Sequence, residues 1–203
     1  MTLIKSISGI RGTIGGPAGD GLTPLDVVKF TSAYAEFLKK RAGKTDLTVV
    51  VGRDARISGE MVSSLVIGTL TGCGIDVIDL GLSTTPTVEV AVPVEKADGG
   101  IILTASHNPK QWNALKLLNE KGEFISGDEG AELLRIAEDE AFDFADVDSL
   151  GSIRKVDDWI DRHVKMVLDL PLVDVDAIKA ANFHVAIDCV NSTGGIALPK
   201  LLT

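Results

Sequence analysis

The chain has 203 residues, 45% of them apolar, so it is long enough and apolar enough to fold around a core. No apolar run approaches the roughly 18 residues of a membrane-spanning helix. Its two cysteines, Cys73 and Cys189, are too far apart for a CxxC zinc site or a disulfide framework. The net charge of −9 arises in residues 128–161, which hold 12 acids and 3 bases, and no basic face is available for nucleic acid. We expect a soluble, cytoplasmic protein that binds neither nucleic acid nor membrane; its oligomeric state stays open.

Apolar periodicity predicts alternating helices and strands over most of the chain. Thr23, Pro24 and Asp26 form a helix-start signal, and Gly43 can end that helix. Short valine- and isoleucine-rich runs are typical of buried strands. In chain order we predict a helix over 24–43, a strand over 47–51, a helix over 58–71, a strand over 75–80, a helix from Thr85 that Pro93 interrupts, a strand over 99–104, and a helix from Ser126 to about Glu138. This alternation predicts an α/β fold with a mostly parallel sheet.

The rest of the chain differs in pattern. Residues 141–155 are acidic and lack a clear period, which is typical of an interdomain linker. A helix over 156–170, a strand over 183–190 and the start of an apolar helix follow. We therefore predict a first domain over 1–140, a linker over 141–155 and an incomplete second domain over 156–203, as in a piece of a longer protein.

Three polar loops follow the predicted strands, at 52–56, 81–85 and 105–113. The carboxyl ends of parallel strands meet at one edge of a sheet, where binding sites collect. Ser106 lies in the last of these loops, in the segment Thr104-Ala105-Ser106-His107-Asn108-Pro109. An exposed serine there is a candidate nucleophile, although serine, asparagine and proline are also ordinary turn residues.

Other readings of these residues fit less well. A serine hydrolase needs a base within reach of the serine, but the side chain of neighbouring His107 diverges from that of Ser106 on an extended segment, and there is no G-x-S-x-G motif. Gly43-Lys44-Thr45 lacks the first glycine of a nucleotide-binding P-loop, since position 38 is leucine. The early glycines do not match a dinucleotide fingerprint either.

A phosphate site agrees better with the distribution of cations. Arg11 lies between Gly9 and Gly12, where the backbone can approach an anion closely. Arg53 and Arg56 flank Asp54 in the second polar loop, and Lys116 follows Ser106 by ten residues. Each could also be an ordinary surface cation.

Three segments together resemble the α-D-phosphohexomutases, the superfamily of phosphoglucomutase, phosphomannomutase and phosphoglucosamine mutase. The segment 104–109 with Asn113 and Lys116 is similar to the active-site signature of that family, 8–12 to its glycine-arginine-glycine motif, and 52–59 to its second loop motif. The order and spacing agree as well. Ala114 departs from the pattern, since the family usually has glycine there.

The resemblance implies a three-layer α/β/α domain with a mostly parallel mixed sheet and the start of a second, similar domain. It implies that phosphorylated Ser106 exchanges its phosphoryl group with a hexose phosphate through a bisphosphorylated sugar. It assigns catalytic roles to Ser106, Lys116, Arg11 and His107, with Lys116 handling the proton of the sugar hydroxyl. It assigns substrate contacts to Arg53, Asn108 and Asn113.

The resemblance also implies Mg²⁺, held here only by a phosphate oxygen on Ser106, because the family's D-G-D-x-D-R loop is missing from this sequence. We therefore expect the chain alone to be inactive and to bind Mg²⁺ weakly. The alternative is a non-catalytic module that kept the fold and binds a sugar phosphate or a partner.

Overall fold

The structure is a computed structural model that describes residues 1–6 and 9–203. Within these ranges seven strands form one mixed sheet in the order β1-β2-β6-β5-β3-β4-β7. The strands are β1 (Ile4–Ser6), β2 (Gly9–Thr13), β3 (Thr48–Arg53), β4 (Asp76–Leu82), β5 (Gly99–Leu103), β6 (Trp112–Leu118) and β7 (Ile153–Lys155). The helices are α1 (Pro24–Ala42), α2 (Gly59–Gly72), α3 (Thr85–Val94), α4 (Gly127–Glu138), α5 (Trp159–Leu168), α6 (Val175–Ala180) and α7 (Gly194–Leu202), with a 3-10 turn at Val147–Ser149.

The sheet is parallel where strands and helices alternate and antiparallel elsewhere. Strand β3 runs parallel to β4 and β5, and β7 runs parallel to β4. Strands β1, β2, β6 and β5 pair antiparallel in turn. The predicted α/β class is therefore confirmed, with a mixed sheet that is mostly parallel in its core. The carboxyl ends of β3, β4 and β5 share one edge, which carries the three polar loops.

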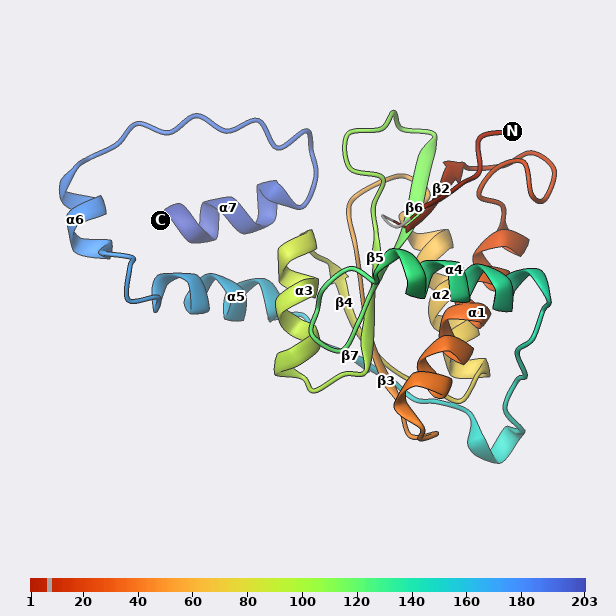
Figure 1. The fold of residues 1–203 in the computed structure, drawn as a ribbon. Helices are drawn as coiled ribbons and strands as arrows, with labels where there is room; N and C mark the ends of the chain where they lie inside the picture. The colour runs from red at the N-terminus through yellow and green to blue at the C-terminus, as the bar shows by residue number, and fades with distance from the viewer. Residues whose placement is uncertain (7–8) are drawn as a thin grey trace.

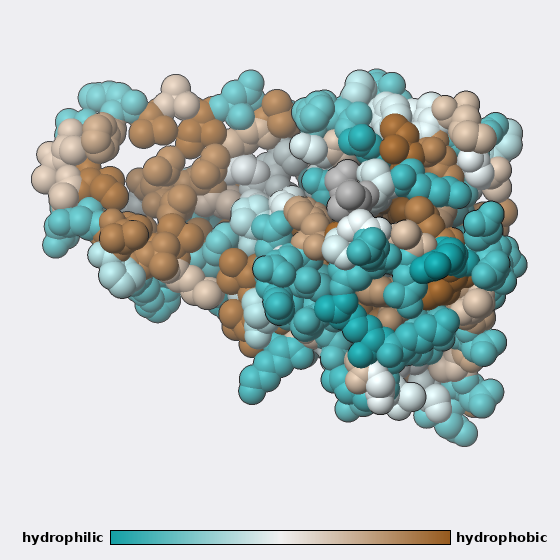
Figure 2. Space-filling view, in the orientation of Figure 1, coloured by the Kyte–Doolittle hydropathy of each residue, from teal (hydrophilic) through white to brown (hydrophobic). Residues whose placement is uncertain are grey.

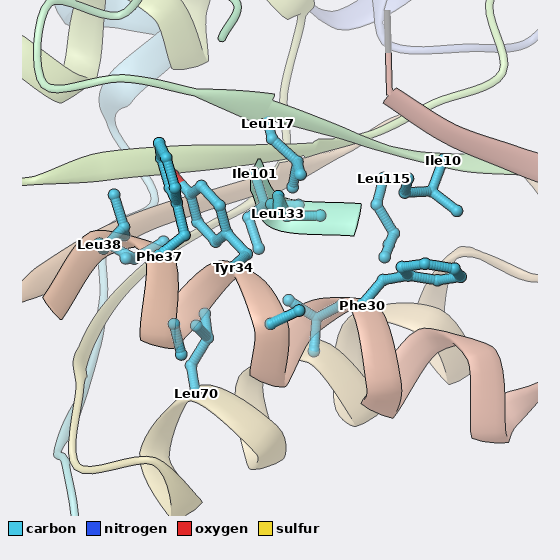
Figure 3. Packing of buried hydrophobic residues seen from close by; sticks show 14 of the residues in the cluster. Ile10, Phe30, Tyr34, Phe37, Leu38, Leu70, Ile101, Leu115, Leu117 and Leu133 are labelled. Atoms are coloured by element: carbon cyan, nitrogen blue, oxygen red, sulfur yellow. The ribbon is translucent and has the colours of Figure 1, made fainter. Parts of the chain in front are cut away.

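Helices cover both faces of the sheet, giving three layers (Figure 1). Strand β3 has apolar side chains on both faces and therefore needs cover on both. Val49 and Val51 face the core beneath α1, α2 and α4, while Val50 between them faces α3. Figure 3 shows the larger core, in which aromatic side chains of α1 meet leucines of the sheet and of α2. Tyr34 stands at its centre: its hydroxyl donates to Leu118 O at 2.6 Å and accepts from Gly100 N at 2.9 Å.

Helix α1 follows the sequence signals closely. The Thr23 side chain accepts from the Asp26 amide and the Asp26 carboxylate accepts from the Thr23 amide, which completes a capping box. Gly43 ends the helix with φ of 61°, a left-handed conformation that glycine adopts without strain.

The structure adds a strand to one predicted segment of the later chain and contradicts the prediction for another. The stretch 141–155 includes strand β7, which pairs with β4 from Val77 to Asp79 and is too short to show a period. The strand predicted over 183–190 is wrong, since these residues have no regular structure. Phe183, Val185 and Ile187 alternate as in a strand, yet they are exposed and no described strand lies beside them to satisfy the backbone. The division into 1–140, 141–155 and 156–203 stays a prediction.

Residues 156–203 extend from the sheet as an arm that contacts α3 (Figure 1). Apolar residues are exposed along this arm (Figure 2). The carboxylate of Glu95 anchors its base: it accepts from Trp159 Nε1 at 3.0 Å, Arg154 at 2.6 Å and Arg162 at 3.3 Å. Further along α5, Thr87 Oγ1 and His163 Nδ1 lie 2.9 Å apart. Lys200 of α7 pairs with Asp161 at 2.5 Å, so α7 is held against α5.

This anchoring should weaken in acid, because burial lowers the pKa of His163 below its ordinary value of 6.5. The unfolded chain then binds the proton more strongly than the folded chain, so stability falls as the pH drops below about 6.5. Thermal unfolding between pH 8 and pH 5 measures this. His163→Gln should lose part of the slope, whereas the exposed His184→Gln should keep it. Equal slopes in both variants would contradict the expectation.

Candidate active site

Ser106 lies exposed just beyond the end of β5, at the sheet edge that the sequence indicated. Its φ is 54°, a left-handed conformation that a residue with a Cβ rarely adopts. Its amide donates to Thr104 Oγ1 at 3.1 Å. Residues held in such conformations concentrate at functional sites, where the surroundings maintain them.

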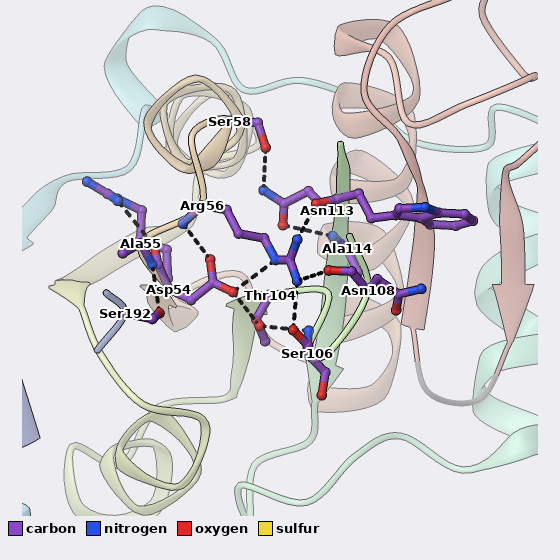
Figure 4. A network of polar contacts seen from close by, with 12 residues as sticks. Asp54, Ala55, Arg56, Ser58, Thr104, Ser106, Asn108, Asn113, Ala114 and Ser192 are labelled. Atoms are coloured by element: carbon purple, nitrogen blue, oxygen red, sulfur yellow. Dashed lines mark hydrogen bonds and ion pairs between the residues drawn. The ribbon is translucent and has the colours of Figure 1, made fainter. Parts of the chain in front are cut away.

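The guanidinium of Arg56 maintains this loop by binding four of its backbone carbonyls (Figure 4). One terminal nitrogen donates to Pro109 O and Trp112 O, each at 3.0 Å. The other donates to Ser106 O at 2.7 Å and Asn108 O at 2.8 Å. These four bonds fix the path of the loop without using any of its side chains.

Asp54 completes this arrangement. Its carboxylate accepts from the Arg56 amide at 3.0 Å, from Arg56 Nε at 3.2 Å and from Thr104 Oγ1 at 2.6 Å. The side chains of Arg56 and Asp54 are only 11% and 14% exposed. A largely buried ion pair with this many hydrogen bonds is well satisfied and therefore rigid. We call Asp54, Arg56 and Thr104 the loop clamp.

From the sequence, Arg56 was predicted only as a possible cation near phosphate, and Asp54 and Thr104 had no predicted role. The one signal available was an Asp-x-Arg pair directly after a buried strand. Hydrogen bonds from Arg56 to carbonyls 50 to 56 residues away have no signature in the local sequence.

Asn113 differs from its predicted role as a substrate contact. Its side chain is 0% exposed, and its Nδ2 donates to Ser58 Oγ at 3.0 Å while its Oδ1 accepts from Ala114 N at 2.8 Å. Both ends of the carboxamide are therefore occupied within the protein. This geometry supports a positioning role, in which Asn113 links β6 to the start of α2.

Arg11 and Lys116 lie on one face of the sheet, the face that α3 covers. Arg11 of β2 pairs with Ala114 of β6, and Lys116 follows Ala114 by two residues, so both side chains point the same way. Lys116 pairs in turn with Ile102, which packs on the α3 side. Ser8 of the same motif lies outside the described residues.

The two cations have different surroundings. Arg11 Nε is buried and has no hydrogen-bond partner among the described residues. Lys116 Nζ lies 5.8 Å from the centroid of the Phe124 ring. Burial raises the pKa of the nearby Glu89 carboxyl, and the positive charge of Lys116 partly opposes that effect. A buried guanidinium nitrogen without a partner is costly, so Arg11 is suited to accept an anionic ligand.

The structure does not bring Arg53 to Ser106. Arg53 donates to Glu60 Oε1 at 3.2 Å and to Asp54 O at 3.2 Å. It lines a separate cavity of about 610 Å³ between α2 and β7, together with Lys155 and Asp157.

Ser106 itself lines a cavity of about 620 Å³, which we call the serine cavity. His107 and Asn108, both predicted site residues, line it as well. The loop of residues 54–57 forms a second side of the cavity, and Lys110 and the segment Val190–Ser192, which were not predicted to belong to the site, complete it. No hydrogen bond in the described part of the chain joins Ser106 to a histidine, so the geometry offers no catalytic triad. It offers an exposed hydroxyl in a fixed loop, with the ammonium of Lys110 in the same cavity; Arg11 and Lys116 are not among the residues that line it.

The family model of phosphoglucomutase/phosphomannomutase, alpha/beta/alpha domain I, matches residues 3–144. The chain belongs to this family. Its match begins before β1 and ends after α4, so it spans both sheet faces and the loop clamp. The resemblance predicted from the sequence is confirmed.

Curated relatives carry the same family names. The chain is 38% identical over 193 residues to a "Phosphoglucomutase/phosphomannomutase" of Thermococcus kodakarensis, with 94% of this chain and 41% of that protein covered. It is 33% identical to a "Phosphoglucosamine/phosphogalactosamine mutase" of Sulfurisphaera tokodaii, with 98% and 42% covered. The chain therefore spans about two fifths of the length of these phosphohexomutases.

Solved structures agree with the fold. A phosphoglucomutase/phosphomannomutase family protein from Burkholderia thailandensis matches with a TM-score of 0.66 and 28% identity, covering 82% of this chain and 36% of that one. The open form of a Paramecium phosphoglucomutase matches with a TM-score of 0.76, covering 97% and 41%, and its 19% identity supports the fold alone. No helix in residues 1–6 and 9–203 is long and apolar enough to cross a membrane.

Proposed function

We propose that this chain carries the phosphoserine site of a phosphohexomutase that interconverts hexose 1-phosphate and hexose 6-phosphate. The observation that supports it best is Ser106: an exposed hydroxyl in a left-handed loop, held by the loop clamp at the edge of a cavity. The names of the relatives support the same substrate class.

In the proposed reaction phospho-Ser106 gives its phosphoryl group to a free hydroxyl of the hexose phosphate. The Oγ–P bond breaks and a P–O bond to the sugar forms, while the proton of the sugar hydroxyl passes by way of Lys116 to Ser106 Oγ. The bisphosphorylated sugar then turns over and returns its other phosphoryl group in the reverse step. Such a transfer depends mainly on positioning and on stabilising charge, the proposed tasks of Arg11 and Lys116.

Smaller roles fall to the residues around Ser106. His107 and Asn108 line the serine cavity, where we propose that they contact the substrate. Arg53 stays a proposed substrate contact only if it leaves Glu60, and Asn113 is assigned to positioning.

Mg²⁺ is the expected cofactor, with a phosphate oxygen on Ser106 as a ligand. In the described ranges no three His, Cys, Asp or Glu side chains gather as a metal site needs. These residues do not form a magnesium site by themselves, and no step above passes through the metal. When bound, Mg²⁺ would neutralise phosphate charge.

Intact-mass measurement after incubation with glucose 1,6-bisphosphate tests the proposal. The wild-type chain should gain one phosphoryl group and Ser106→Ala none, because only that hydroxyl lies in the clamped loop. Ser64→Ala, an exposed serine of α2, is the matched control and should be labelled like the wild type. Labelling that persists in Ser106→Ala would place the site elsewhere.

The same experiment separates the alternative of a non-catalytic binding module. Such a module would bind hexose phosphate without gaining mass. A serine hydrolase would instead be labelled on Ser106 by a fluorophosphonate, and we expect no such labelling. We also expect no robust turnover of glucose 1-phosphate by the 203-residue chain with Mg²⁺.

A further inference from the structure

One wall of the serine cavity comes from the arm. Val190, Asn191 and Ser192 face the loop clamp and the Ser106 loop across a space of about 620 Å³, although they follow Ser106 by more than eighty residues. Figure 1 shows this segment, just before α7, beside the loop that joins β5 to β6. The cavity is thus enclosed by two parts of the chain that are far apart in sequence.

The segment is held in place on its own side of the cavity. The Val190 amide donates to Asp188 Oδ1 at 2.9 Å, and the Ser192 amide donates to Cys189 O at 2.8 Å. Helix α7 follows directly and is paired with α5, which Glu95 attaches to the end of α3. Across the cavity, one hydrogen bond joins this segment to the loop of residues 54–57 in the part of the chain that the structure describes. It is a long one, from Ala55 N to Ser192 Oγ at 3.5 Å (Figure 4).

The polar groups around the cavity differ in whether their hydrogen-bonding atoms are already occupied within the protein. Arg56 and Asp54 are fully used by the loop clamp. The side chains of Asn191 and Lys110 have no hydrogen-bond or ion-pair partner in the part of the chain that the structure describes, and both are exposed at the cavity. One wall therefore presents a free ammonium and the other a free carboxamide beside a hydroxyl.

These groups suit a ligand that combines an anionic phosphate with hydroxyl groups. An ammonium binds phosphate as a point charge, and a carboxamide both donates to and accepts from hydroxyls. We propose that Asn191 and Ser192 form a sugar-recognition wall of the serine cavity, with Lys110 binding the phosphate opposite. The arm then contributes to substrate specificity, and the inference rests on the proposed function of Ser106.

Two phosphoryl donors isolate the contribution of the sugar. Glucose 1,6-bisphosphate presents hydroxyls to Asn191, whereas acetyl phosphate presents none. Asn191→Ala should slow labelling of Ser106 by the sugar bisphosphate about tenfold, as expected for losing one or two hydrogen bonds, and leave labelling by acetyl phosphate unchanged. Equal slowing with both donors, or no slowing with either, would overturn the proposal.

Asn182→Ala is the matched control. Asn182 has φ of 49° and Asn191 has φ of 54°, so both alanine variants meet the same left-handed strain, but Asn182 does not line the serine cavity. We expect Asn182→Ala to be labelled by both donors at the wild-type rate.

A binding measurement keeps this proposal separate from that of the phosphoserine. In an NMR titration of the wild-type chain with glucose 1-phosphate, the side-chain amide signals of Asn191 should shift together with backbone signals of 106–110, whether or not Ser106 accepts a phosphoryl group. Shifts confined to 106–110, or no shifts at all, would refute the sugar-recognition wall. Failure of both donors to label Ser106, with the Asn191 shifts present, would refute the phosphoserine alone.

Discussion

Arg56→Lys is expected to slow labelling of Ser106 by glucose 1,6-bisphosphate about 100-fold, because a shift of the reacting hydroxyl by about 1 Å costs that much. Lysine keeps the positive charge but cannot donate to four carbonyls at once from one planar group. The Ser106 loop then loses its fixed path, and with it the left-handed conformation that presents the hydroxyl.

The loss of labelling should exceed what stability alone explains. Removing several hydrogen bonds at this largely buried site costs about 2 kcal/mol of unfolding free energy, which leaves most molecules folded. Denaturant unfolding and the time course of intact mass measure the two effects separately. Arg135→Lys, an exposed arginine near the end of α4, serves as the control for the substitution itself. Wild-type labelling by Arg56→Lys would show that the clamp does not position Ser106.

Gly122→Ala is expected to destabilise the fold by about 3 kcal/mol or more, since it combines left-handed strain with a backbone clash. Gly122 has φ of 77°, and an added Cβ would lie 1.9 Å from Glu89 O and 3.2 Å from Pro93 Cδ. The turn after β6 packs directly on α3 at this point, so neither backbone can move away without opening the α3 face of the sheet.

Gly43→Ala separates the two contributions. Gly43 has φ of 61° with nothing within 4 Å of the added carbon, so only the strain of about 1 kcal/mol applies. Urea unfolding of both variants gives the comparison. Similar losses in the two variants would mean that the contact between the turn and α3 yields easily.

The parts of the fold that the sequence predicted are those with a local signature. The run Val49-Val50-Val51 makes both faces of β3 apolar, as a central parallel strand requires. The helix starts at Thr23 and Ser126 could be predicted because each capping box is contained within four consecutive residues. Strand β6 had no such signature. Its run is broken by two polar residues: Asn113, whose carboxamide donates to Ser58 at the start of α2, 55 residues away, and Lys116, whose ammonium lies near the Phe124 ring.

The candidate site also has parts that the sequence could predict and parts that it could not. Ser106 was predictable because it directly follows a buried strand, and the edge position follows from the topology. The loop clamp was not predictable, because Arg56 binds backbone carbonyl oxygens. Every residue has such an oxygen, so these bonds do not require particular residue types in the loop. The position of Val190–Ser192 beside the serine cavity was not predictable either, since only the packing of α5 and α7 brings this segment there. The predicted strand over 183–190 failed because pairing needs a neighbour that residue alternation does not reveal.

Because Arg56 binds main-chain oxygens, the loop around Ser106 can tolerate changes in its side chains during evolution. Since the hold on the loop is indifferent to side-chain identity, mutations at His107 or Lys110 can accumulate without displacing the serine. Under the proposed function, selection can then change the preference for a sugar one residue at a time, while Ser106 keeps its place. A scaffold built in this manner favours diversification of substrate range among descendants that share one chemistry.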